Sequence, residues 1–146
     1  MFYNPTLGMI ALALIGMSLF AREWRVSSIR ALHLALGLTI AYGLMFADNT
    51  FGLWSSFGFD FSTHTAVAVA LVTYLCVHAP KAALVWIISL VGYFVFMVYK
   101  GYHGVLDVIT TTVAVLLPLV LLVRYLNSFK PLNIPTYKIF GSPGAN

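Results

Sequence analysis

Long apolar runs occupy most of this sequence and restrict the folds open to it. Five stretches with at most one charged residue each can be delimited, at 3–21, 29–47, 62–80, 82–99 and 104–123. The hydrocarbon core of a bilayer is about 30 Å thick, so a spanning helix needs about 20 mainly apolar residues. Lipid offers no hydrogen bonds to the backbone, which favours helices. We therefore predict an all-α, polytopic membrane bundle of about five transmembrane helices.

The low content of charged residues supports the same fold class. Only 8% of the 146 residues are charged, against about 25% in soluble domains. The five spans use nearly the whole chain, so we predict a transmembrane domain over 1–126 and a cytoplasmic C-terminal tail over 127–146. The net charge of +4 reflects membrane topology, and we expect no nucleic-acid partner.

The basic residues fall on one side of the membrane if the five spans alternate in direction. The other side then holds Lys100, Asp48, Asp60 and Asp107. The side rich in Lys and Arg is expected to be cytoplasmic. The N-terminus is then outside and the C-terminus inside, in a plasma or inner membrane. The seven residues on the cytoplasmic side are Arg22, Arg25, Arg30, Lys81, Arg124, Lys130 and Lys138.

Three ionisable residues stand at the outer ends of predicted spans. His64 begins the third span, while His103 and Asp107 begin the fifth, four residues apart. Positions i and i+4 share one helix face, so the Asp107 carboxylate is expected to orient the His103 imidazole, as in a catalytic triad. His64 is then available to protonate a leaving group. The competing interpretation is that each histidine is simply an interfacial residue.

The same residues resemble two motifs of the type 2 phosphatidic acid phosphatase superfamily. The segment Phe-Ser-Thr-His-Thr at 61–65 resembles its second motif, most closely the form found in the sphingomyelin-synthase-like branch. The segment His-Gly-Val-Leu-Asp at 103–107 resembles its third motif. A two-helix hairpin separates the motifs, as in that family. The resemblance covers residues 60–125, about half of the chain.

The resemblance implies a lipid phosphatase or phosphotransferase that acts at the outer membrane face. His103 would be the nucleophile, forming a phosphohistidine, Asp107 would orient it and His64 would be the general acid. Ser62 and Lys100 would bind the substrate phosphate. The substrate would be a lipid phosphate or phospholipid, with no metal and no cofactor. A homo-oligomer or a membrane-protein partner is compatible with this expectation.

Departures from the family pattern keep other functions open. Thr63 replaces the glycine of the second motif, the first motif is missing, and Lys100 can equally be an interfacial lysine. A non-catalytic relative that serves as a membrane binding or assembly subunit is the main alternative. A haem b anchor, with His33 and His78 as axial ligands, is a weaker one. Aromatic residues near the outer end of the fourth span are expected to contact lipid, and some to line a groove for a lipid chain.

Overall fold

The computed structural model describes residues 2–128, and all of their regular structure is helical, which confirms the predicted all-α class. Residues 129–146, most of the predicted tail, lie outside the described residues. The predicted boundary at 126 falls inside the last helix. The elements are α1 (Tyr3–Phe20), α2 (Trp24–Phe51), η1 (Ser55–Phe57), α3 (Thr63–His78), η2 (Pro80–Ala82), α4 (Ala83–Tyr99) and α5 (Val105–Ser128).

Four helical segments are long and apolar enough to cross a membrane: α1, α2, the run from Pro80 to Tyr99, and the part of α5 up to Tyr125. These features are those of an integral membrane protein. The helix α2 is longer than the predicted span 29–47, because its first and last turns carry polar residues that continue the helix. It ends at Gly52, whose φ of 62° places it in the left-handed region that favours glycine. Residues 48–51 therefore belong to the last turn of α2.

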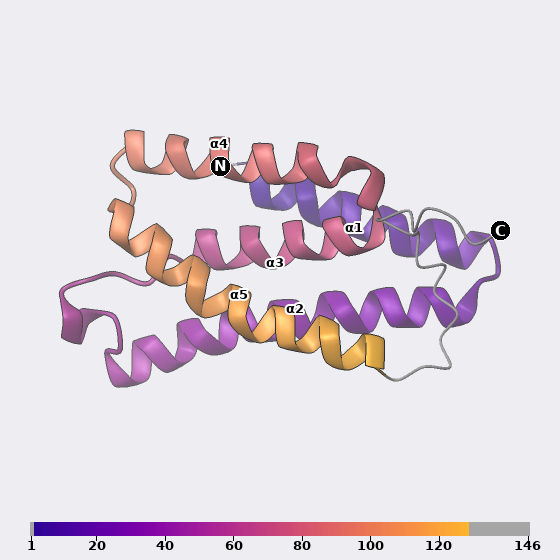
Figure 1. The fold of residues 1–146 in the computed structure, drawn as a ribbon, viewed down its shortest axis with the longest axis horizontal. Helices are drawn as coiled ribbons and strands as arrows, with labels where there is room; N and C mark the ends of the chain where they lie inside the picture. The colour runs from indigo at the N-terminus through magenta and orange to yellow at the C-terminus, as the bar shows by residue number, and fades with distance from the viewer. Residues whose placement is uncertain (1, 129–146) are drawn as a thin grey trace, which may run out of the picture.

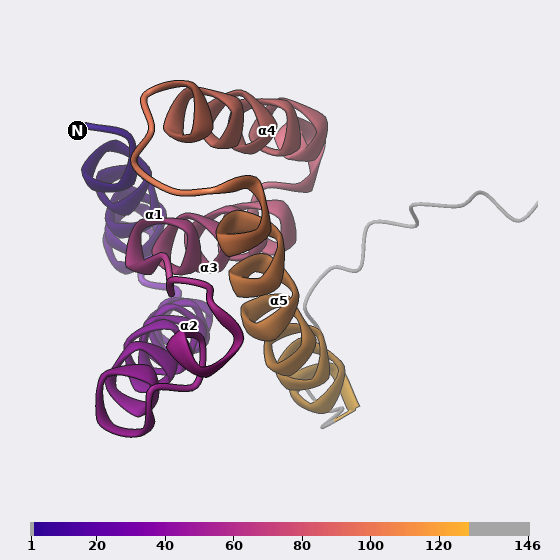
Figure 2. The same cartoon turned by 90° about the vertical axis from the view of Figure 1, so that its left-hand side faces the viewer.

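The third predicted span, 62–80, corresponds to α3, a short helix of 16 residues at the centre of the bundle. It packs against α1, α2, α4 and α5, and Figure 2 shows it between them. Its alanines Ala66, Ala68 and Ala70 are buried, and small residues let helices approach closely in membranes. A Cβ on Gly37 of α2 would lie 3.8 Å from the Ala70 Cβ. Enclosure by its neighbours allows a helix of this length to stay buried.

Successive α-helices run in opposite directions, so the connections between them lie at the two ends of the bundle (Figure 1). One end carries the α1–α2 turn, η2 and the end of α5, where the basic residues of the described chain concentrate. The other end carries the loop after α2, the start of α3 and the α4–α5 connection. His64, His103 and Asp107 belong to this second end, called here the outer end.

Candidate active site

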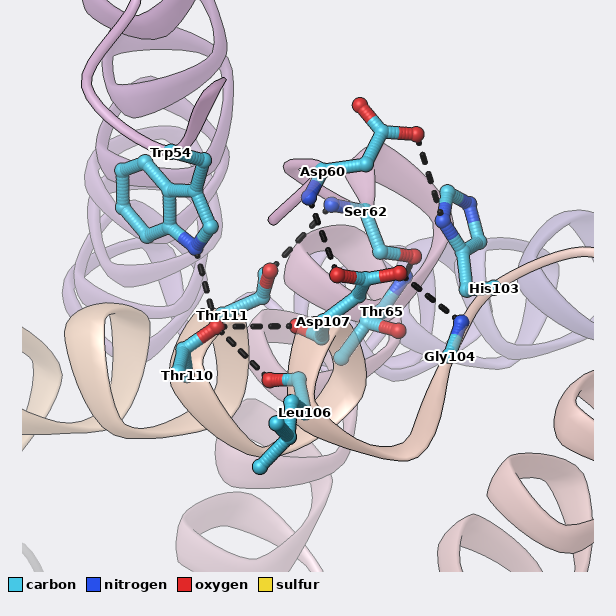
Figure 3. Close-up of polar contacts among 10 residues, drawn as sticks. All are labelled: Trp54, Asp60, Ser62, Thr65, His103, Gly104, Leu106, Asp107, Thr110 and Thr111. Carbon is cyan, nitrogen blue, oxygen red and sulfur yellow. Dashed lines mark hydrogen bonds and ion pairs between the residues drawn. The ribbon is translucent and has the colours of Figure 1, made fainter. Parts of the chain in front are cut away.

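The loop between α2 and α3 is fastened to one face of α5. The Trp54 indole N–H donates to the Thr110 hydroxyl at 3.0 Å, and the Ser62 backbone N–H donates to the Thr111 hydroxyl at 3.2 Å. The Asp60 backbone N–H donates to Asp107 Oδ1 at 2.9 Å. The acceptors at 107, 110 and 111 share one helix face because of their spacing. Figure 3 shows how these contacts bring the two loops of the outer end together.

Trp54 is held in place through both its side chain and its backbone. Its side chain is half-buried, and its ring meets that of Phe61 edge to face, with centroids 4.8 Å apart. Asp48 Oδ1 accepts the Trp54 backbone N–H at 2.7 Å. The three consecutive threonines Thr110, Thr111 and Thr112, within a mostly apolar helix, were the sequence signal for this anchoring face.

The predicted alignment of His103 and Asp107 on one helix face is wrong. The helix α5 begins at Val105, so His103 precedes it. Asp107 is the third residue of α5, and its Oδ2 accepts the Gly104 backbone N–H at 2.8 Å, which is half of a capping box. Its other oxygen accepts the Asp60 N–H. Asp107 thus ties the start of α5 to the preceding loop.

The carboxylate that faces the His103 imidazole belongs to Asp60. His103 Nδ1 lies 3.6 Å from Asp60 Oδ2, and Figure 3 shows the two side chains pointing toward each other. His103 is 15% exposed and Asp60 is 76% exposed. Nδ1 is buried, and within residues 2–128 it has no hydrogen-bond partner. Sequence reasoning missed Asp60 as a site residue because no local spacing connects it to position 103.

Ser62 caps the start of α3 and is not exposed at the surface. It is fully buried, and its hydroxyl accepts the Thr65 backbone N–H at 3.3 Å as the N-cap of α3. Serine is among the preferred residues at this position. The Ser62 hydroxyl accepts this bond and keeps its own O–H donor, but the side chain is fully buried. Its role in binding the substrate phosphate stays a prediction.

His64 and Lys100 are both exposed at the outer end. His64 lies in the first turn of α3, and its carbonyl oxygen accepts a hydrogen bond from the Asn4 side-chain amide at 3.0 Å. Lys100 is the C-cap of α4, three residues before His103. The fold therefore brings His64, Lys100 and His103 to the same end of the bundle, with the His64 side chain open to the surroundings.

A cavity of about 370 Å³ is lined by Phe2, Tyr3, Tyr93, Phe96 and Tyr102. The Tyr3 and Tyr93 rings are stacked, with centroids 4.2 Å apart. Three of these residues, Tyr93, Phe96 and Tyr102, belong to the aromatic residues near the end of the fourth predicted span, most of which we expected to contact lipid and some to line a groove. Two of the lining residues are next in sequence to residues connected with the histidines. Tyr102 precedes His103, and Asn4, which follows Tyr3, donates to the His64 carbonyl oxygen.

His33 and His78 form a separate pair at the basic end of the bundle. His33 Nδ1 lies 3.0 Å from His78 Nε2, and the Tyr74 ring packs against both imidazoles. Metal–imidazole bonds are about 2.0–2.1 Å, so two axial imidazoles on one iron stand about 4 Å apart. A direct hydrogen bond leaves no space for a haem, so these residues do not fit the haem b alternative. They join α2 to α3, as packing histidines do.

No protein-family model, curated protein or solved structure matches this chain.

Proposed function

We propose that this protein is a membrane enzyme that transfers a phosphoryl-type group from a lipid phosphate or phosphodiester, through a phosphohistidine at His103. The observation that carries the proposal is the buried Nδ1 of His103 beside the Asp60 carboxylate, at the end of the bundle where His64 is exposed. A carboxylate at one ring nitrogen fixes the tautomer and leaves the other nitrogen basic.

The residues divide the reaction into two balanced steps. In the first, the His103 Nε2 lone pair attacks phosphorus while the phosphorus–oxygen bond to the leaving group breaks. Protonated His64 gives its proton to the departing oxygen. In the second, water or an acceptor alcohol attacks the phosphohistidine, the phosphorus–nitrogen bond breaks, and neutral His64 takes the proton. Both enzyme groups then return to their starting protonation states.

The charges at the outer end favour a singly charged phosphate. Within residues 2–128, this end has one basic side chain of the lysine or arginine type, Lys100. It has three carboxylates, those of Asp48, Asp60 and Asp107. A phosphomonoester dianion gains little from one exposed ammonium, which acts as a screened point charge. A phosphodiester carries one negative charge and meets less repulsion from the three aspartates. We therefore expect lipid phosphodiesters to be the better substrates, with apolar parts of the lipid in the aromatic cavity.

The competing proposal is a subunit without catalytic activity that binds or assembles other membrane components. The buried place of Ser62 and the capping role of Asp107 favour it, because two of the five predicted site residues serve the fold. Turnover separates the two proposals directly.

The deciding experiment is a screen of the purified protein, reconstituted in vesicles, against a panel of lipid phosphates and lipid phosphodiesters. The enzyme proposal expects release of phosphate or of a phosphorylated head group, faster from phosphodiesters, with and without added alcohol acceptors. A heat-denatured sample is the blank. Complete inactivity across the panel, for protein whose helical circular-dichroism spectrum is intact, would favour the binding subunit.

The proposed sidedness places the outer end outside the cell. The separation of basic residues motivates it, through the positive-inside rule. We expect Ser56→Cys and Tyr102→Cys, each in a Cys76→Ala background, to react with an impermeant maleimide added to intact cells. Both positions are exposed in the structure. Glu23→Cys, exposed at the opposite end, is the matched control and should react only after the membrane is permeabilised.

Labelling of Ser56→Cys and Tyr102→Cys from opposite sides would contradict the fold itself, because both loops lie at one end (Figure 1). Labelling of both from the inside, with Glu23→Cys labelled from the outside, would reverse the proposed orientation and leave the fold intact.

A further inference from the structure

The surroundings of His103 leave one of its ring nitrogens without a partner. Nδ1 is buried, no hydrogen bond to it is formed among the described residues, and the Asp60 Oδ2 at 3.6 Å lies beyond hydrogen-bond distance. A buried polar atom without a partner destabilises the folded state, because its lost hydrogen bond to water is not replaced. The Asp60 side chain is 76% exposed and has room to rotate. A shift of about half an ångström would bring the two atoms to about 3.1 Å, within hydrogen-bond range.

Asp107 is the residue that the motif resemblance implied for this task, but its oxygens are engaged elsewhere. One accepts the Gly104 N–H and the other accepts the Asp60 N–H, at 2.8 and 2.9 Å. The second bond holds the backbone of Asp60 in the position from which its side chain reaches His103. Asp107 therefore acts on the His103 imidazole indirectly, because it fixes Asp60, the residue that faces the imidazole.

We propose that Asp60 is the positioning residue for the His103 nucleophile, and that Asp107 holds Asp60 in place by accepting its backbone N–H. This inference rests on the proposed phosphohistidine chemistry. Asp60 accepts the Nδ1–H of His103, so the Nε2 lone pair is free to attack phosphorus. The imidazole gains positive charge as the phosphorus–nitrogen bond forms, and the adjacent carboxylate stabilises that charge.

The first test reads the imidazole directly and needs no turnover. Nitrogen-15 NMR of the histidine-labelled full-length chain, in nanodiscs at neutral pH, reports which ring nitrogen carries the proton. The His103 resonances are assigned with His103→Gln. We expect the Nδ1–H form in the wild type and a shift toward the Nε2–H form in Asp60→Ala. Asp60→Glu should recover part of the Nδ1–H form, while Glu23→Gln, which removes an exposed carboxylate at the other end, should change nothing.

The second test compares kinetics with stability. Asp60→Ala should lower kcat about 10- to 100-fold with a small change in KM. This loss is below the roughly 10⁴-fold loss seen for buried triad carboxylates, because Asp60 is exposed and its charge is screened. Its thermal unfolding should match the wild type. Asp107→Ala should instead lower the unfolding temperature, because two hydrogen bonds to a charged acceptor are lost.

The outcomes separate this inference from the proposed function. If the wild type turns over and His103→Gln is inactive, but Asp60→Ala keeps the wild-type tautomer and kcat, the assignment of Asp60 is overturned and the proposed function stands. Absence of turnover by the wild type would overturn the proposed function, and with it any role of Asp60 in a reaction. A changed tautomer together with a reduced kcat supports the inference.

Discussion

Replacement of His103 by alanine should abolish turnover and leave no trace of a phosphorylated intermediate. The reason is that the nitrogen that forms the covalent bond is removed, and no other group within the described outer end can replace it at the same place. His64→Ala should retain slow turnover, with larger losses for lipids whose leaving oxygen is more basic, because general acid catalysis contributes about 10²–10⁴-fold and matters most there. Rapid-quench trapping of phosphorylated protein from head-group-labelled lipid, followed by acid and base treatment, measures both effects.

The matched control for these variants is His33→Ala, which removes an imidazole from the opposite end of the bundle. Its stability must be measured in parallel, because His33 is buried. Equal losses of activity in His103→Ala and His33→Ala, at equal folded fractions, would show that the outer histidines have no special role. A phosphorylated intermediate that survives in His103→Ala would move the nucleophile to another residue.

Tyr74→Ala should destabilise the bundle more than any other single truncation at the basic end. Tyr74 is 1% exposed in the core of α3, and its ring lies 4.5 Å from that of His78 and 5.7 Å from that of His33, between ring centroids. Truncation of a buried aromatic residue to alanine costs about 3–5 kcal/mol. The loss should also loosen the imidazole pair that joins α2 to α3. Thermal unfolding of the purified protein in mild detergent, followed by circular dichroism, measures the change.

Tyr74→Phe is the matched variant that separates packing from hydrogen bonding. The Tyr74 hydroxyl lies 3.5 Å from the Ala11 carbonyl oxygen, at the outer limit for a hydrogen bond. We therefore expect Tyr74→Phe to cost less than about 1 kcal/mol. If Tyr74→Phe lowers the free energy of unfolding as much as Tyr74→Ala does, the hydroxyl rather than the ring holds α1, α2 and α3 together.

The helical architecture could be predicted because each span leaves a signal in its own residues. The run from 3 to 21 matches α1 closely, since apolar composition and length alone specify a span. The end of α2 could not be placed in the same way, because Asp48, Asn49 and Thr50 are typical of a loop. They remain helical because the left-handed Gly52 is the first residue that ends the helix. The central position of α3 depends on packing with four other helices, which no window of sequence reports.

The candidate site was predictable as a set of residues at one membrane level, but not as a set of contacts. The spacing of His103 and Asp107 predicts a shared face only if both residues are helical, and Gly104 marks the N-cap of α5 between them. The nearest carboxylate to His103 comes from Asp60, across a loop that is held by Thr110 and Thr111. Contacts of this kind join positions about 40 or more residues apart, and a single sequence gives no measure of them.

The shortness of α3 also determines how deep a substrate must sit. At about 1.5 Å per residue, its 16 residues extend about 24 Å, less than the roughly 30 Å hydrocarbon core. His64, in its first turn, therefore lies near the boundary between head groups and acyl chains when α3 is centred in the bilayer. A lipid can present its phosphate there with its chains still in the leaflet. Extraction into water, at about 0.8 kcal/mol for each exposed methylene, is avoided.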